Sequence, residues 1–376
     1  MNEVAECARE PLEWCLTSQQ QGTDDFELSV VIPTFNSAIW LPSTFAALSR
    51  ALQQTPWTVE IVVVDDGSTD NTSEVLEKVA LTLPYPVNVV KQSNQGRFMA
   101  RWNGIQAATH EDTLIIDSRM LVHEQTFAYV EAARQRGAIP SVWNGHVITD
   151  QAAPLVGRFW EVPTFLFWGK YLSRPKPTLI TAANFDSVPK GTSFLLIKKE
   201  LFERACLAIW PTENAHLTSD DTKLLRHVVG ETPILLDPSF SATYRPRSTV
   251  RKFLAHSWVR GTLFVDSYAG TSPLRNAVLL ALVATPPVAL VALGFGILTG
   301  SRAISLSLVG TALGALLAPF AVAAGRGSPA KANLSYLTFV LPFGGAFWAG
   351  LTRGVVVHRN NFRRTARVNA ETQVKP

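Results

Sequence analysis

The sequence predicts an α/β protein in which a mostly parallel sheet is followed by an interface helix and C-terminal transmembrane helices. Two short apolar runs, 28–32 and 61–64, are rich in β-branched residues and do not alternate with polar ones. Such runs suit strands that are buried on both faces of a parallel sheet. Segments with helical spacing and short loops separate these strands, which favours a right-handed winding. From residue 276 onward Ala, Leu, Val and Gly dominate the chain.

Composition excludes some classes of protein. The 376 residues suit two or three structural units. The net charge of +4 and a pI of about 9.0 are modestly basic. Because no Lys/Arg tract is interleaved with aromatic residues, nucleic-acid binding is disfavoured. Cys7, Cys15 and Cys206 are scattered, which argues against a zinc site and for a reducing compartment. Residues 1–26 are polar and acidic, unlike a signal peptide, and we expect a mobile leader.

The first 150 residues are expected to alternate between strands and helices. The predicted strands are 28–32, 59–65, 87–90, 113–116 and one near 139–143, and the predicted helices are 38–53, 72–82, 95–109 and 123–136. The pattern weakens over 150–190, where Pro and aromatic residues suit either a lid or acceptor surface, or core packing with contact to the bilayer interface. A strand at 192–198, a helix at 199–208, a helix from 219 and a short strand at 234–236 follow.

Polar residues follow the first two strands directly. Pro33, Thr34 and Asn36 come after the first, and Asp65 and Asp66 after the second. Open α/β sheets bind ligands at the carboxyl ends of their strands, so these residues predict a ligand site. Neither G-x-G-x-x-G nor G-x-x-x-x-G-K-[ST] occurs, which disfavours a dinucleotide-type phosphate loop.

Three apolar segments form a predicted membrane domain at 276–358. The segments 277–299 and 303–324 carry no charge, and each can cross a hydrocarbon core of roughly 30 Å as a helix. The third, 334–357, is long enough, but it contains Arg353 and is interrupted by PFGG at 342–345.

Positive charges near these segments help to place them. The residues are Arg260, Arg275, Arg302, Arg326, Lys331, Arg359, Arg363, Arg364 and Arg367. Three crossings divide these charges almost evenly between the two sides. Two crossings with a re-entrant or interfacial third segment put all but Arg302 on one side, which the positive-inside rule favours. Either arrangement predicts a multi-pass protein of the cell (inner) membrane with its soluble domain in the cytoplasm.

Basic segments flank the membrane domain. Residues 244–275 combine Arg and Lys with Phe253, Trp258 and Phe264, which is typical of an amphipathic helix on anionic headgroups. Residues 359–376 form a basic tail.

Five motifs, in order, resemble family 2 glycosyltransferases with the GT-A fold. VVIPTFN at 30–36 resembles the family's V-V-I-P-x-Y/F-N, and VVVDDGSTDNT at 62–72 resembles its V-D-D-G-S-x-D. NQGRFMARWNGI at 94–105 is similar to its N-x-G-x-x-x-A-R-N-x-G. LIIDSR at 114–119 and SDDTKLL at 219–225 stand where the family carries D-x-D and E-D-x-x-L. The resemblance implies a catalytic domain over 27–243.

The resemblance also implies roles in donor binding. Residues that would line the nucleotide pocket are Pro33, Thr34, Asn36, Asp65 and Asp66. Turn formation through D-G-S is the structural alternative for the two aspartates. Arg97 or Arg101 would approach the diphosphate, and a solvated helix face is the alternative for both.

Asp221 is the candidate general base. It matches the Asp of the family's E-D pair, and Asp220 replaces the Glu. In an inverting transfer such a carboxylate takes the proton of the acceptor hydroxyl as that oxygen attacks the anomeric carbon. The alternative is that both acids only complement the dipole of a helix.

Asp117-Ser118-Arg119 departs from the family pattern. The D-x-D normally helps to hold Mg²⁺ or Mn²⁺ against the diphosphate, and here Arg119 replaces the second acid. Either Asp117 still binds a metal, or Arg119 neutralises the diphosphate through its planar guanidinium and reduces the need for one. A third alternative is that donor binding has been lost.

The resemblance and the membrane segments together imply an inverting glycosyltransferase. We expect a nucleotide sugar as donor and a lipid-linked or cell-envelope glycan as acceptor, with Arg245, Arg247 and Arg260 holding the acceptor's pyrophosphate beside membrane lipids. Transfer to polyprenyl phosphate is one alternative. A non-catalytic, nucleotide-binding membrane scaffold is another.

Overall fold

A computed structural model describes residues 26–137, 140–211 and 215–362, and the side chain of Asp220 lies outside what it describes. Most of the predicted leader and of the basic tail, with Cys7 and Cys15, also lies outside. The chain forms two compact units. The first comprises 1–150, 175–216 and 220–245, and the second 151–174, 217–219 and 246–376.

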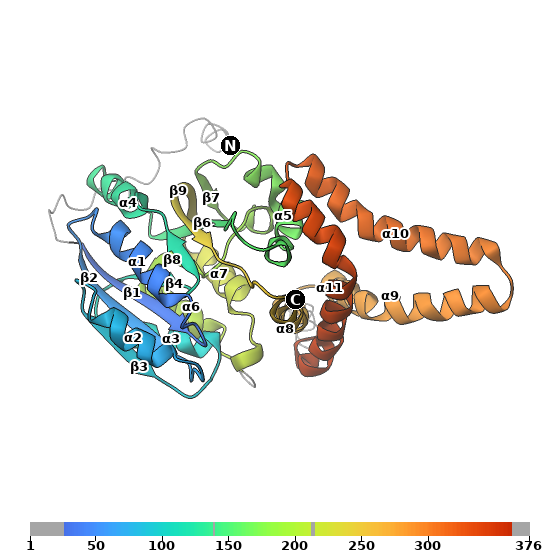
Figure 1. Ribbon diagram of the computed structural model, residues 1–376, viewed down its shortest axis with the longest axis horizontal. Coiled ribbons are helices and arrows are strands. Elements are labelled where there is room, and N and C mark those ends of the chain that lie inside the picture. The colour runs from blue at the N-terminus through green and yellow to red at the C-terminus, as the bar shows by residue number, and fades with distance from the viewer. Residues whose placement is uncertain (1–25, 138–139, 212–214, 363–376) are drawn as a thin grey trace, which may run out of the picture. The chain divides into compact units, whose positions relative to one another are not determined.

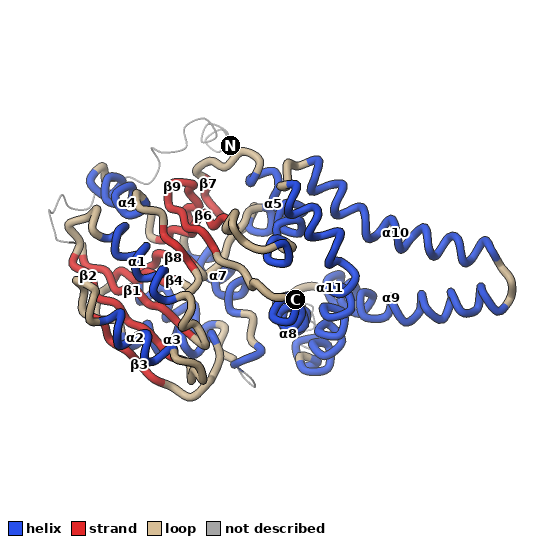
Figure 2. Tube along the Cα trace, viewed as in Figure 1, coloured by secondary structure: helices blue, strands red, loops and turns tan. Residues whose placement is uncertain are grey.

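The first unit is built on one mixed sheet with helices packed on it (Figures 1 and 2). The strand order is β3-β2-β1-β4-β8-β6-β9-β5, and β7 pairs with β9. The strands are β1 Glu27–Thr34, β2 Thr58–Asp65, β3 Val87–Lys91, β4 Asp112–Ile116, β5 Met120–Val122, β6 Val142–Thr149, β7 Thr178–Ile180, β8 Phe194–Lys198 and β9 Ile234–Tyr244. The helices are α1 Leu41–Leu52, α2 Thr72–Ala80, α3 Arg97–Ala107, α4 Thr126–Gln135, α6 Lys199–Ala208 and α7 Asp220–Glu231, with short 3-10 turns at η2 Phe185–Ser187 and η3 Ala215–Leu217.

The predicted parallel winding is confirmed for the first four strands. β1 pairs in parallel with both β2 and β4, and β3 extends the sheet beyond β2. The apolar side chains of β1 and β2 are buried on both faces, including Val30, Val31, Val62 and Val63. Because the four strands run in the same direction, their carboxyl ends meet at one edge of the sheet.

The second half of the sheet differs from the prediction. β8 inserts antiparallel between β4 and β6, and β5 and β7 pair antiparallel with β9. β9 has 11 residues, whereas the sequence predicted a strand over 234–236 only. The polar run Asp237-Pro238-Ser239 is typical of a strand end. The strand accommodates it where the register of the β6–β9 pair shifts next to Gly145.

The second unit is helical. It contains η1 Leu155–Arg158, α5 Glu161–Leu172, α8 Val250–Tyr268, α9 Pro273–Leu298, α10 Arg302–Gly325 and α11 Ala330–Val357. The helices α9, α10 and α11 are each long and apolar enough to cross a membrane. α9 contacts α10, and Figure 1 shows the two as a hairpin whose turn lies at 299–301. α11 runs across the base of this hairpin in the same view.

α11 corrects one expectation and refines another. PFGG at 342–345 does not interrupt the segment, because one continuous helix with an internal Pro342 runs through it. α11 is also more covered than its neighbours. In an apolar stretch of 18 residues, 22% of α11 is buried, compared with 6% of α9 and 6% of α10. Most of that cover comes from α8.

Glycines bring α8 and α11 into backbone contact. The Thr262 hydroxyl donates a hydrogen bond to the Gly350 carbonyl at 3.0 Å. A Cβ atom on Gly350 would lie 2.0 Å from the Trp258 carbonyl oxygen, and one on Gly261 would lie 2.2 Å from the Phe347 carbonyl oxygen. α8 is amphipathic, because Phe253 and Val265 are buried whereas Trp258 and Arg260 are exposed.

Candidate functional site

The loop after β1 is held by Asn36. Asn36 has a φ of 48°, the left-handed conformation that Asn tolerates better than most residues. Its Oδ1 accepts hydrogen bonds from the backbone N–H of Thr69 at 2.8 Å and of Asp70 at 3.3 Å. Its own N–H donates to the Ser68 hydroxyl at 2.9 Å. Asn36 therefore joins the loops that follow β1 and β2, and its predicted nucleotide contact stays a prediction.

Pro33 and Thr34 end β1 beside that loop. Both are buried, and Thr34 is only 2% exposed. Within the part of the chain that the structure describes, the Thr34 hydroxyl oxygen has no hydrogen-bond partner. A buried hydroxyl without a partner is uncommon in folded proteins, so Thr34 is a candidate contact for a bound ligand.

Asp65 and Asp66 shape the second loop. Asp65 accepts hydrogen bonds from the Ser68 N–H and the Ser73 hydroxyl, each at 3.0 Å. The Asp66 carboxylate accepts from the N–H of Gln95 at 2.7 Å and of Gly96 at 3.0 Å, and Gly96 directly precedes α3. Both side chains are buried. Asp65 thus forms the turn that was the structural alternative, whereas Asp66 holds the loop before α3, and a nucleotide contact by either one remains a prediction.

Arg101 joins two predicted site residues from opposite ends of the domain sequence. It lies on α3 and is 2% exposed. Its Nη2 donates to Asp117 Oδ1 at 2.9 Å, and its Nη1 donates to Asp221 Oδ1 at 3.2 Å. Asp117 follows β4 and Asp221 lies in the first turn of α7, so one guanidinium holds both carboxylates at the carboxyl edge of the sheet.

Thr192 and Arg97 also lie against Asp221. The Thr192 hydroxyl donates a hydrogen bond to Asp221 Oδ1. Arg97 Nη2 lies 3.8 Å from its Oδ2, and the Arg97 side chain is 36% exposed. The Asp221 side chain itself is 27% exposed, so it is fixed by its neighbours but remains open to a substrate. Asp220 begins α7, and its predicted role lies outside the described side chains.

Arg119 and Arg245 face one indole. The guanidinium carbon of Arg119 lies 5.1 Å from the centre of the Trp40 ring, and that of Arg245 lies 5.0 Å from it. Such distances are typical of cation–π contacts. The Nη1 atom of Arg119 is buried and has no hydrogen-bond partner among the described residues. Arg119 thus lies two residues after Asp117 with hydrogen-bonding capacity unused.

Arg245 is packed into the first unit. It is 8% exposed and donates to the Trp40 carbonyl at 3.0 Å and to the hydroxyls of Ser43 and Thr44. Burial, with a smaller effect of the nearby Arg119 charge, lowers the pKa of Arg245. These contacts favour a structural role for Arg245 over the predicted pyrophosphate contact.

The two other basic residues of the predicted acceptor site lie in the second unit. Arg247 is half-buried and Arg260 is exposed on α8. Arg260 Nε lies 3.3 Å from His256 Nε2. Their role in acceptor binding stays a prediction.

Asp117 is the one predicted metal ligand. Within the described ranges, no three His, Cys, Asp or Glu side chains gather to hold a metal ion. Asp117 Oδ1 is bound to Arg101, and no hydrogen bond to Oδ2 comes from the described residues. Hard divalent cations need several oxygen ligands. The side chains therefore fit a metal only as a one-carboxylate site that a bound diphosphate completes.

Sequence reasoning missed Thr192. Gly191-Thr192-Ser193 was assigned only to the start of a strand, yet the Thr192 side chain contacts Asp221. The loop before Thr192 packs around Phe185. Lys190 Nζ lies 4.2 Å from the centre of the Phe185 ring, and the guanidinium carbon of Arg226 lies 4.4 Å from it. Burial lowers the pKa of Lys190 to about 8. The sequence did offer one signal for this contact. Thr192 is a hydroxyl residue just before a strand, and such a residue can reach the ligand edge of the sheet.

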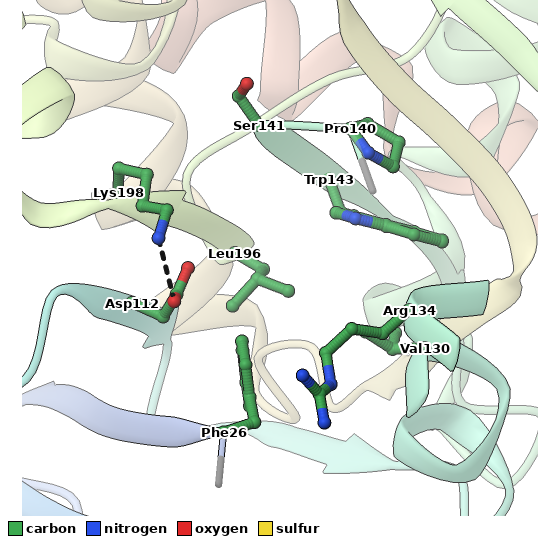
Figure 3. A pocket seen from close by; sticks show the side chains of 9 residues that line it. All are labelled: Phe26, Asp112, Val130, Arg134, Pro140, Ser141, Trp143, Leu196 and Lys198. Carbon is green, nitrogen blue, oxygen red and sulfur yellow. Dashed lines mark hydrogen bonds and ion pairs between the residues drawn. The ribbon is translucent and has the colours of Figure 1, made fainter. Parts of the chain in front are cut away.

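A small cavity lies away from these residues (Figure 3). The cavity is lined by Asp112 at the start of β4 and by Lys198 at the end of antiparallel β8. Lys198 Nζ lies 3.0 Å from Asp112 Oδ2. The cavity is therefore at the amino ends of the parallel strands, opposite the site. Its volume of about 120 Å³ is well below the roughly 300 Å³ of small ligand pockets, so it does not compete as a donor site.

The first unit is similar to known glycosyltransferase domains. The profile of the family described as "Glycosyl transferase family 2" matches residues 29–129. A mannosyltransferase from Pyrobaculum calidifontis, solved in complex with GDP-Man and Mn²⁺, superposes with a TM-score of 0.58. It is 18% identical, and the match covers 92% of this chain and 91% of that one. The fold is therefore of the GT-A type.

Curated relatives match the same region. An uncharacterized glycosyltransferase of Nostoc sp. is 37% identical over 92 residues, which is 24% of this chain and 28% of the relative. An undecaprenyl-phosphate 4-deoxy-4-formamido-L-arabinose transferase of Pseudomonas syringae is 30% identical over 92 residues, which is 24% of this chain and 27% of the relative. The chain thus spans less than a third of the length of these relatives. Residues 29–129 thus match family 2 glycosyltransferases, and three apolar helices follow later in the chain.

Proposed function

We propose that this protein is an inverting glycosyltransferase that moves a sugar from a nucleotide sugar to a lipid-linked or cell-envelope glycan at the cytoplasmic face of a membrane. The observation that carries the proposal is Arg101, which holds Asp117 and Asp221 at one edge of the sheet. The family match over 29–129 supports the reaction class. In this proposal 27–243 form the catalytic domain, 244–275 the interface segment and 276–358 the membrane domain.

The donor would occupy the carboxyl edge of the parallel strands. Its nucleoside would lie against the loops that Asn36, Asp65 and Asp66 shape, near the Thr34 hydroxyl, which has no partner among the described residues. Its diphosphate would face Asp117, Arg119 and the exposed part of Arg97. Guanidinium groups suit this role because their planar donors match phosphate oxygens.

The transfer would be a single displacement. The acceptor hydroxyl oxygen forms a bond to the anomeric carbon while the bond from that carbon to the donor's diphosphate breaks. Asp221 accepts the hydroxyl proton, and the nucleoside diphosphate leaves with the electron pair. Thr192 and Arg101 orient the Asp221 carboxylate for this step.

A divalent ion fits the donor side of the site. Asp117 would supply the protein's oxygen ligand for Mg²⁺ or Mn²⁺, and the ion would neutralise charge on the diphosphate when bound. The Mn²⁺ in the mannosyltransferase complex supports this assignment. Arg119, at the position of the family's second acid, would supply a further positive charge to the same group.

The helices favour two membrane crossings. α9 and α10 form the hairpin, with Arg302 near its turn and Arg275 and Arg326 near its base. By the positive-inside rule, the base of the hairpin would then lie on the cytoplasmic side. α11, which packs on α8, would lie at the interface rather than cross. The relative named as an undecaprenyl-phosphate transferase supports a membrane acceptor.

Cysteine labelling in a variant that lacks Cys7, Cys15 and Cys206 tests this topology. In intact cells, a membrane-impermeant maleimide is expected to label Ser301→Cys, because this residue lies in the hairpin turn. Thr271→Cys and Arg359→Cys are expected to react only after lysis. External labelling of Arg359→Cys would establish a third crossing, and external labelling of Thr271→Cys would reverse the orientation.

Transfer to polyprenyl phosphate is the second candidate function. It is favoured by Arg119, whose buried Nη1 atom has no hydrogen-bond partner among the described residues. A phosphate acceptor is already an anion and would need no strong base. The effect of losing the Asp221 carboxylate separates the two functions.

A donor screen tests the proposed function itself. Purified full-length protein is incubated with radiolabelled UDP- and GDP-sugars, a membrane lipid extract and Mn²⁺. One donor is expected to give a labelled, lipid-extractable product, and EDTA is expected to lower the rate by at least about tenfold, reversibly with Mn²⁺. Binding of nucleotides without transfer from any donor would favour the scaffold alternative. Transfer that resists EDTA would assign the whole neutralising role to Arg119.

A further inference from the structure

We propose that Asp266 is a positioning residue, which anchors the chain segment directly before the candidate base to helices α8 and α11. This inference rests on the proposed function only where it concerns the rate of transfer. The anchor itself is a structural arrangement that can be tested without activity.

Asp266 is a buried carboxylate that the reaction does not use. It lies near the end of α8 and is 4% exposed. Its Oδ2 accepts the backbone N–H of Ser219 at 2.7 Å. Burying a carboxylate is costly unless charge-assisted hydrogen bonds satisfy it, so this arrangement strongly specifies the position of Ser219.

Two residues that follow α11 complete the anchor. Asn361 Nδ2 donates to Asp266 Oδ1 at 3.0 Å, and His358 Nδ1 lies 3.5 Å from the same oxygen. The end of α11 thus fixes the side chain that holds Ser219. The close glycine contacts between α8 and α11 hold these two helices together, so Asp266 and its partners just after α11 stay in register.

A second contact holds the same segment. The Ser267 and Ser219 hydroxyl oxygens are 2.6 Å apart, and Ser219 is 8% exposed. The Ser219 backbone and side chain are therefore both bound to α8, through adjacent residues. One bond would restrain the chain at this point, whereas two also restrain its orientation.

The anchor acts on the candidate base through the chain itself. Ser219 immediately precedes α7, and Asp221 is the second residue of that helix. We expect a released Ser219 to let the first turn of α7 open more often, which would loosen the hold of Thr192 and Arg101 on the Asp221 carboxylate. Misplacement of a reacting group by about 1 Å can cost up to about a hundredfold in rate.

Hydrogen exchange tests the anchor directly. In Asp266→Asn, one carboxylate oxygen becomes an amide donor, so the side chain cannot accept from all three partners. We expect backbone amides over 217–224 to exchange at least about tenfold faster than in the wild type. Equal exchange in Asp266→Asn and the wild type would overturn the proposal.

Asp237→Asn is the matched control for the exchange experiment. Asp237 is a 2% exposed carboxylate that accepts a backbone N–H, from Ser239 at 2.8 Å. Its substitution should leave exchange over 217–224 unchanged. Faster exchange there in both variants would show a general loss of stability and would count against the anchor.

Kinetics then separate positioning from general stability. For Asp266→Asn we expect kcat to fall about tenfold or more, while donor KM and nucleotide affinity change less than about twofold. A purely structural role would instead lower the yield of folded protein and leave kcat per folded molecule unchanged, and that result would reject the rate effect.

A second variant covers the case in which Asp266→Asn does not fold. Ser267→Ala removes only the hydroxyl contact to Ser219, and we expect faster exchange over 217–224 with a smaller fall in kcat. Unchanged exchange in Ser267→Ala would then count against the anchor. If the wild type transfers no sugar from any donor, the proposed function fails, but the exchange results still decide the anchor.

Discussion

Asp221→Asn is expected to lower kcat about a thousandfold, with the affinity for the donor nucleotide nearly unchanged. The substitution keeps the shape of the side chain but removes the carboxylate that would take the acceptor proton, and general base catalysis is worth roughly 10²- to 10⁴-fold. The amide would also keep an oxygen that accepts the Thr192 hydroxyl, so the local fold should persist. Initial rates with saturating donor and acceptor, with nucleotide binding by calorimetry, measure the two effects separately.

The matched control is Asp186→Asn. Asp186 also pairs with an arginine, since Arg226 lies at 3.0 Å, but its side chain is 50% exposed. Surface ion pairs contribute little, so its kcat should stay within about twofold of the wild type. If Asp221→Asn retained most of its activity while Arg119→Ala lost it, the acceptor would be an anion such as polyprenyl phosphate.

Arg101→Met is expected to have the second large effect, a loss of at least about a hundredfold in kcat/KM. Without the guanidinium, the carboxylates of Asp117 and Asp221 face each other and the donor's diphosphate with no buried positive charge between them. Breaking a buried ion pair on one side costs about 3–5 kcal/mol because a charge is left without a partner. The measurements are kcat/KM for the donor and the free energy of unfolding in denaturant.

A double mutant separates charge from packing. Arg101→Met with Asp117→Asn removes one of the stranded carboxylates, so it should recover stability relative to Arg101→Met alone. Arg97→Met is the positional control. Arg97 lies on the same helix, but it is more exposed and lies 3.8 Å from Asp221, so its loss should cost less. Equal losses from Arg97→Met and Arg101→Met would show that the bridge has no special importance.

The parallel half of the sheet was predictable because burial on two faces leaves a clear pattern. Uninterrupted β-branched runs such as those of β1 and β2 are typical of buried parallel strands, and both strands formed where predicted. The strands β5 and β7 have three residues each, too few for a periodic pattern to appear. Their pairing with β9 depends on tertiary contacts that lie about 50 to 120 residues apart in sequence.

The site was predictable as a set of residues but not as a network. Motif order predicted that Asp117, Asp221 and Arg101 share one region, and the structure brings them together. A solvated helix face was a fair alternative for Arg101, because an arginine on a helix is usually exposed. Its 2% exposure follows from packing between strands and α7 that no local pattern encodes. The cluster of basic residues near Arg245 predicted a charged surface. In the structure, however, the Arg245 side chain is buried next to α1.

The close contact between α8 and α11 has a consequence for the route of a lipid substrate. Along Gly261, Gly350 and Gly354 the two helices touch through backbone atoms, with no gap that an isoprenoid or acyl chain could enter. If the acceptor is a lipid, as proposed, it would have to pass around this pair of helices rather than between them. The headgroup of such a lipid would then move along the exposed surface of α8, which carries Trp258 and Arg260.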